Sequence, residues 1–167
     1  MVLRNKKRNN DQAATTYAFY RWIWTNLYEN KPYDQFVRDI LTASGNADDV
    51  PAVTRYREVD QTNEQVEDVA QLFLGLRIQC ARCHHHPFEK WSQDDYYGLA
   101  AFFSRVGRKN IIGGNNQMRD KRIFHQDNQG PAQARNDRSG KMLAPAGLGS
   151  QPLTLTAEED PRTHLAD

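Results

Sequence analysis

The first 106 residues contain four stretches in which apolar side chains recur every three or four positions. This spacing predicts four helices, because side chains three and four positions apart share one face of a helix. The predicted helices cover residues 11–30, 32–41, 62–74 and 92–103. In the first, Tyr17, Tyr20, Trp24 and Leu27 recur at helical spacing, and Phe19 and Ile23 lie beside them in the same wide face. We expect this aromatic face to be buried, and residues 47–60, which contain Pro51, to form a loop.

Local signals mark the start of the third and fourth helices. Thr62 and Gln65 have the spacing of a capping box, in which the first side chain accepts a hydrogen bond from the backbone three residues later. Ser92 and Asp95 repeat this spacing. Asp94 and Asp95 would then lie in the first turn of the fourth helix, where carboxylates offset the positive end of the helix dipole. We therefore interpret them as structural groups and not as an acid–base pair.

The chain beyond residue 106 has weaker patterns. Residues 107–167 are rich in Gly, Asn, Gln, Arg and Pro, a composition typical of irregular structure. Within them we expect a turn at 111–115, a strand at 123–125, a hairpin loop at 136–140 and a helix start at 158–161.

The predicted fold class is therefore mainly α, with about four helices around a Cys-x-x-Cys-His site and an irregular C-terminal segment with short strands. We divide the chain into a disordered basic terminus at 1–10, a helical core at 11–106, and an irregular segment at 107–167 that includes a candidate hairpin.

Composition excludes several classes of protein. The chain has 167 residues, which suits one domain with a loose tail. Its net charge of +1 gives no overall field that would attract nucleic acid. No apolar run approaches the roughly 18 residues of a membrane span. The basic residues 1–8 are not followed by an apolar stretch, so no signal peptide is predicted.

The segment that carries recognisable chemistry is Cys80-Ala81-Arg82-Cys83-His84. This C-x-x-C-H pattern is typical of c-type haem attachment. Two thiols on one side of a turn can add to the two haem vinyl groups, and His84 would then be an axial ligand of the iron. A disulfide between Cys80 and Cys83 would close a very short loop and stabilise little. Our main hypothesis is thus a haem c module for electron transfer.

A divalent metal is the main alternative cofactor. Cys80, Cys83 and either His84 or His86 would supply three zinc ligands, and His125 is a candidate for the fourth. Three protein ligands with an open position would suit a metal-dependent hydrolase, with zinc or calcium activating water to attack an ester or lactone. A closed site would suit a structural metal-binding module for interaction with other proteins.

Two further points stay open at this level. Arg82 and His84 would favour thiolates and hence thiol redox chemistry, although no strand–helix context of the thioredoxin kind is present. A sixth haem ligand is not defined by spacing. The candidates are His125, His164, Met118 and Met142.

The residues around the motif resemble a known family. The segments that carry the resemblance are Val69-Ala70-Gln71-Leu72-Phe73-Leu74-Gly75-Leu76, Cys80-Ala81-Arg82-Cys83-His84, His86-Pro87-Phe88, Trp91, Gln93-Asp94, Tyr96-Tyr97 and 100–102. Residues 31–37 and 134–149 contribute as well. Together they resemble the cytochrome-c-like DUF1549 domain of planctomycetes and related bacteria.

The resemblance implies an exported or periplasmic parent protein with several domains. Such proteins carry a further cytochrome-like domain upstream and a DUF1553 domain downstream, so we expect this chain to be a fragment of a DUF1549/DUF1553 protein, with residues 107–167 leading to the downstream domain. Cys80 and Cys83 would be the thioether positions and His84 the axial ligand. The expected partners are a redox protein or the adjoining domains.

Overall fold

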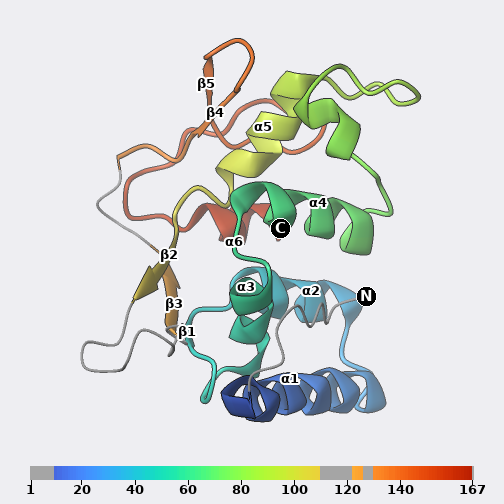
Figure 1. The fold of residues 1–167 in the computed structure, drawn as a ribbon, viewed down its shortest axis with the longest axis vertical. Helices are drawn as coiled ribbons and strands as arrows, with labels where there is room; N and C mark the ends of the chain where they lie inside the picture. Colours follow the sequence, from blue (N-terminus) through green and yellow to red (C-terminus); the bar gives the residue numbers. More distant parts are fainter. Residues whose placement is uncertain (1–9, 110–121, 126–129, 167) are drawn as a thin grey trace. The chain divides into compact units, whose positions relative to one another are not determined.

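The computed structural model describes residues 10–109, 122–125 and 130–166, and it is mainly helical there (Figure 1). The expected turn at 111–115 and Met118 lie outside the described residues. Contacts divide the chain into two compact units. The first unit combines residues 1–60, 106–125 and 166–167, and the second combines residues 61–105 and 126–165.

The first unit contains helices and a small antiparallel sheet. Its elements are α1 (Asn10–Tyr28), α2 (Tyr33–Leu41), β1 (Gly45–Asn46), η1 (Pro51–Val53, a 3-10 turn), α3 (Thr54–Glu58), β2 (Val106–Lys109) and β3 (Arg122–His125). The strand order is β1-β3-β2, and Gly45 pairs with Ile123. The strand expected at 123–125 is therefore confirmed.

The segment at 47–60, expected to be a loop, is the centre of this unit. It forms η1 and α3, and η1 contacts α1, α2 and β1. Val53 and Tyr56 are fully buried, and the Tyr56 hydroxyl donates to the carbonyl of Leu41 over 2.5 Å. The loop prediction was wrong because Pro51 begins a helical turn here instead of interrupting one.

Helix α1 buries only part of the wide aromatic face that we predicted, since Phe19 is fully buried as expected. Tyr17, Tyr20, Trp24 and Leu27 are all more than half exposed. Thr15 and Phe19 lie on the buried side. The ring of Phe19 stacks on Trp22 with centroids 5.9 Å apart, and Trp22 stacks on Phe36 with centroids 5.3 Å apart. Periodicity locates a face on a helix but does not say which of two apolar faces meets the core.

The second unit is organised around one short helix. Its elements are α4 (Thr62–Phe73), η2 (Gln79–Arg82, a 3-10 turn), α5 (Gln93–Ala101), β4 (Ala134–Arg135), β5 (Met142–Leu143) and α6 (Pro161–Leu165). Helix α5 contacts α4, η2, β4 and β5. A Cβ atom added at Gly98 would lie 3.1 Å from the Cβ of Ala146, so the glycine lets this later segment approach the helix closely.

The two predicted capping boxes had different outcomes. At α5, the Asp95 backbone donates to Ser92 Oγ over 3.2 Å and the Ser92 backbone donates to the Asp95 carboxylate over 2.8 Å, which confirms the prediction. At α4 the prediction was wrong, because the helix already includes Thr62 and its N-cap is Gln61. Gln65 is instead a buried residue of the helix.

The irregular C-terminal segment is fixed to the end of α5 by one buried arginine. Nη1 of Arg105 donates to the carbonyls of Thr156, Ala157 and Glu159 over 3.1, 2.7 and 3.2 Å, and Nη2 donates to the carbonyl of Gly130. The hairpin of β4 and β5 and the start of α6 at Pro161 agree with the sequence-based expectations. The guanidinium of Arg105 thus holds four backbone carbonyls of a segment that has few apolar side chains.

We predict that Arg105→Met lowers the free energy of unfolding by about 2–4 kcal/mol, because several buried carbonyls lose their donor. Urea denaturation followed by circular dichroism measures the change. Arg138→Met, at an exposed position of the same segment, is the control and should stay within about 0.5 kcal/mol of the wild type. Equal midpoints for the two variants would contradict the role given to Arg105.

Candidate functional site

The cysteines lie on a tight turn that exposes both thiols. The backbone amides of Cys83 and His84 both donate to the carbonyl of Cys80, each over 3.2 Å. Cys80 and Cys83 are free and exposed, whereas Ala81 between them is fully buried. The turn therefore has a thiol side that faces solvent and an opposite side that packs on the protein.

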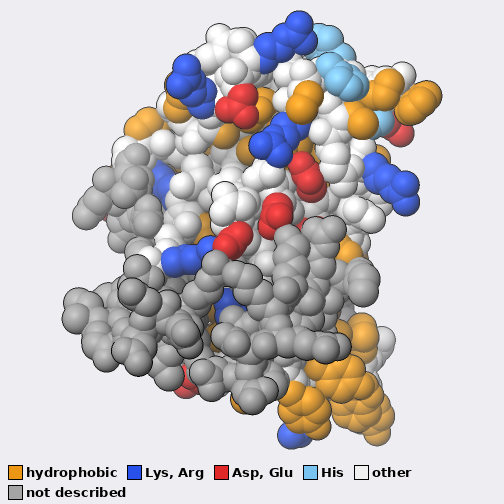
Figure 2. Space-filling view, in the orientation of Figure 1, with side chains coloured by type: hydrophobic (Ala, Val, Ile, Leu, Met, Phe, Trp, Pro, Cys, Tyr) orange, Lys and Arg blue, Asp and Glu red, His pale blue; other side chains and the backbone are white. Residues whose placement is uncertain are grey.

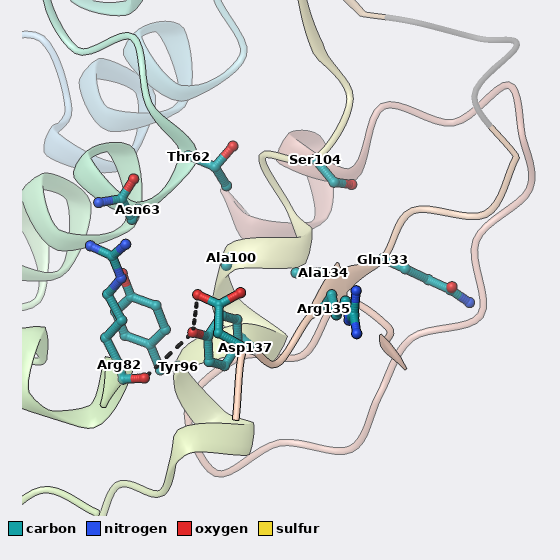
Figure 3. Close-up of a pocket in the computed structure, with 11 residues that line it drawn as sticks. Thr62, Asn63, Arg82, Tyr96, Ala100, Ser104, Gln133, Ala134, Arg135 and Asp137 are labelled. Atoms are coloured by element: carbon teal, nitrogen blue, oxygen red, sulfur yellow. Dashed lines mark hydrogen bonds between the residues drawn. The ribbon is translucent and has the colours of Figure 1, made fainter. Parts of the chain in front are cut away.

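Helix α5 holds the packed side of this turn. Nε2 of Gln93 donates to the carbonyl of Arg82 over 3.2 Å. The hydroxyl of Tyr97 lies 3.4 Å from the same carbonyl and 3.0 Å from the carboxylate of Asp137, so its one proton serves two acceptors (Figure 3). The position of the thiols is thus fixed by α5 and by a residue of the β4–β5 loop.

Behind the turn the second unit contains a cavity of about 340 Å³, lined by both polar and apolar groups (Figure 3). Asn63, Arg82, Tyr96 and Asp137 are among the lining residues. Burial raises the pKa of Tyr96 and of Tyr97, and the hydrogen bond to Asp137 raises the pKa of Tyr97 further. Both tyrosines are therefore neutral hydrogen-bond donors at physiological pH.

One ring nitrogen of His84 is hydrogen-bonded, which leaves the other, Nε2, able to bind a metal ion. Its Nδ1 lies 2.6 Å from the carbonyl of His85. A carbonyl only accepts, so Nδ1 carries the proton and Nε2 has a free lone pair. This is the arrangement in which metal-bound histidines occur, with one nitrogen on the metal and the other donating to a carbonyl. His84 is exposed on the same turn as the two thiols.

His86 has a different role, because both of its ring nitrogens already have partners. Nε2 donates to the carbonyl of Arg77 over 2.8 Å. Nδ1 accepts from the backbone amides of Phe88 and Glu89 over 3.3 and 3.0 Å. His86 therefore organises the loop that follows the motif, and in this conformation it offers no lone pair to a metal.

The residues considered as zinc ligands are not gathered into one site. In the described part of the chain, no three side chains of His, Cys, Asp or Glu lie close enough together to hold a metal ion. The proposed fourth ligand, His125, belongs to β3 of the first unit, and its side chain lies outside the described residues.

The candidates for a sixth haem ligand are placed as follows. His164 lies on α6 with its Nε2 3.3 Å from the carboxylate of Glu159, and Met142 is an exposed residue of β5. Among the residues that the structure describes, no hydrogen bond or ion pair joins either of them to His84. Met118 is outside that part of the chain.

The carboxylates at the start of α5 are structural, as the sequence indicated. Asp94 accepts from Nζ of Lys141 over 2.8 Å and from Nδ2 of Asn136 over 3.0 Å. The hydrogen bond from Lys141 holds the pKa of Asp94 below its ordinary value, which is opposite to the shift that a general acid needs. Asp95 belongs to the capping box with Ser92.

Sequence reasoning missed the groups that hold the turn from behind. Gln93 and Tyr97 donate to the carbonyl of Arg82, and the Tyr97 hydroxyl also donates to Asp137, which is 40 residues away in the chain. No local pattern signals a pair at that separation. The sequence indicated His86 as a candidate metal ligand, whereas in the structure its Nε2 donates to the carbonyl of Arg77.

The donors at the turn fit the chemistry of haem c. Two unpaired thiols and one imidazole with a free Nε2 are exposed within five residues of a single turn. Exposed apolar side chains are available on the same stretch of chain, since Leu74 is 50% and Phe88 92% exposed. Figure 2 shows histidine side chains at the surface with hydrophobic side chains beside them.

Comparison with protein-family models matches residues 2–108 to the PSCyt2 family, described as a protein of unknown function (DUF1549). The match covers more than half of the chain and includes the whole cysteine–histidine turn. The chain therefore belongs to the DUF1549 family. A search of the curated proteins found no match, and a search of the solved structures found none either.

Within the described ranges, no helix combines the length and the apolar composition that a bilayer crossing needs.

We predict that His86→Ala speeds hydrogen exchange at the amides of Phe88 and Glu89 by about tenfold or more, because their shared acceptor is removed. Exchange measured by nuclear magnetic resonance reports each amide separately. His85→Ala is the matched control, because the ring of His85 accepts from neither amide, and the two amides should exchange there as in the wild type. Unchanged exchange in His86→Ala would show that the ring does not order the loop.

Proposed function

We propose that this domain carries a covalently attached haem c and transfers electrons. The observation that supports the proposal best is the state of His84, whose Nδ1 is hydrogen-bonded while its Nε2 is free beside two exposed thiols. When bound, the haem would supply one-electron exchange between its ferric and ferrous states. The protein's own part is to present the three donor groups.

Cys80 and Cys83 would form the two thioether bonds. Each thiol adds across a vinyl C=C bond: a carbon–sulfur bond forms at one vinyl carbon, and the thiol hydrogen ends on the other. The addition consumes no oxidant or reductant, but it requires both thiols in the reduced state. The absence of a disulfide between these two exposed cysteines is consistent with that requirement.

The surroundings of the turn favour an exposed cofactor edge. Phe88 offers apolar surface that is almost entirely open to solvent. An edge in solvent would allow outer-sphere transfer to a redox protein or to adjoining domains of a longer chain. The proposal also requires export of the parent protein to the periplasm, because haem c is attached there by a maturation system.

We predict that the chain, exported together with a cytochrome c maturation system, acquires a Soret band that survives acid–acetone extraction. Cys80→Ser and Cys83→Ser should each lose one thioether bond, and the double variant should retain no haem after extraction. His84→Ala should lose the low-spin spectrum of a histidine-ligated haem. His85→Ala is the matched control and should keep both the haem and the spectrum, because its ring is not part of the motif.

Metal analysis of the same preparations separates the proposal from its alternatives. Iron in a stoichiometric amount with a retained Soret band supports haem c. Zinc or calcium without haem, in protein made with an active maturation system, would contradict it. Hydrolysis of esters or lactones that is lost in Cys83→Ser would then support a metal-dependent hydrolase, and loss of folding without any turnover would support a structural metal module.

A further inference from the structure

Helix α1 presents an aromatic face that no described residue of the first unit covers. Its large apolar side chains are exposed by 53–77%, and Tyr33 at the start of α2 is exposed by 62%. The members on the helix are Tyr17, Tyr20, Trp24, Leu27 and Tyr28. Figure 2 shows hydrophobic side chains gathered over α1, at the lower right of the view. We call these six residues the α1 face.

The rings of the α1 face are already ordered against one another. Tyr17 stacks on Tyr20 with centroids 6.2 Å apart, and Trp24 stacks on Tyr28 with centroids 5.0 Å apart. The opposite side of the helix is occupied by Phe19 and the core of the unit. The face is therefore preformed, so binding a partner would cost less side-chain conformational entropy than it would for disordered rings.

The size of the face matches one half of a stable protein interface. Exposed Tyr and Trp side chains at these fractions, together with Leu27, amount to about 600–800 Å² of surface. A standard interface buries about 800 Å² on each partner. Contiguous apolar patches above a few hundred Å² are uncommon on monomers, and Tyr and Trp are the residue types that dominate binding energy at interfaces.

We propose that the α1 face binds the α1 face of a second copy of this chain, with the two helices antiparallel and crossing near Trp24. Such pairing is isologous, because each copy contributes the same surface and the contact closes on itself. Both partners then contribute the area that a standard dimer interface needs. No other partner has to be assumed.

The charges on and beside the face are compatible with this pairing. Arg21 lies between Tyr17 and Trp24 on the helix, and no ion pair joins its side chain to another described residue. In an antiparallel crossing at Trp24, Arg21 lies opposite Leu27 and Tyr28 of the second copy. The two guanidinium groups would then be about 9 Å apart along the axis, and each could stack on a tyrosine ring.

The neighbouring lysine does not disturb this arrangement. Lys31 is already paired with the carboxylate of Asp39, and its ammonium lies 5.9 Å from the centroid of the Trp22 ring. No acidic side chain belongs to the α1 face. The charges around the α1 face therefore do not call for a strongly acidic or strongly basic partner. A second aromatic face with one arginine would suit both the exposed rings and Arg21.

Sedimentation velocity of the full chain without haem, from about 1 to 200 μM, tests the proposal independently of the cofactor. We expect a reversible dimer, weakened at least 100-fold by Trp24→Glu, which places a charge at the crossing point. Trp24→Phe should remain dimeric. Gln71→Glu adds the same charge at an exposed position of α4 and is the matched control.

Arg21→Glu is a second variant that leaves the core of the unit untouched. It should weaken the dimer at least tenfold, because the stacking cation is replaced by an anion, while the circular dichroism spectrum stays that of the wild type. A chain that is monomeric over the whole range would overturn the proposal, whether the face then binds another part of the chain or a different protein. A dimer unaffected by Trp24→Glu and Arg21→Glu would overturn it as well.

Discussion

The ring of His86 is the constraint on which the shape of the cysteine–histidine loop depends. One nitrogen bonds to the carbonyl of Arg77, before the motif, and the other accepts from two backbone amides after it. The backbone amide of His86 also donates to the carbonyl of Trp91 over 3.0 Å. One residue thus closes a segment that has few buried apolar side chains of its own.

This closure explains how an exposed turn keeps a defined geometry. His86 joins the two ends of the loop by its hydrogen bond to the carbonyl of Arg77. The buried side of the turn is held to α5 by the hydrogen bond from Gln93 to the carbonyl of Arg82. Ala81 provides the small buried side chain between the two thiols. The thiols and His84 are then free to face solvent, because the residues between and after them make the structural contacts. Exposed side chains and side chains that make structural contacts therefore alternate within a few residues.

The sequence predicts the parts of this fold that depend on local signals. The capping box at Ser92 and Asp95, the hairpin of β4 and β5, and the start of α6 each follow from residues that are close together in the chain. The burial of α1 was predicted only in part, because apolar side chains lie on both of its sides and only tertiary contacts choose between them. Phe19 is buried as expected, whereas Tyr17, Tyr20, Trp24 and Leu27 are exposed.

In the candidate site, too, local sequence signals predict some features, whereas features that depend on tertiary contacts are not predicted. The donors Cys80, Cys83 and His84 could be read from their spacing alone, and the family match to residues 2–108 includes them. The role of His86 could not be predicted, because its carbonyl partner and its two amide donors follow from the folded path of the loop and not from a local pattern. The support from Tyr97 and Asp137 joins residues 40 positions apart, for which a single sequence carries no signal.

The most direct test of this account is the tautomeric state of the two histidines in the cofactor-free chain. Nitrogen-15 magnetic resonance in alkaline buffer distinguishes a proton on Nδ1 from a proton on Nε2. We expect His84 to carry its proton on Nδ1, leaving Nε2 free for a ligand, and His86 to carry it on Nε2, leaving Nδ1 to accept from the loop. A proton on Nε2 of His84, or on Nδ1 of His86, would contradict the account.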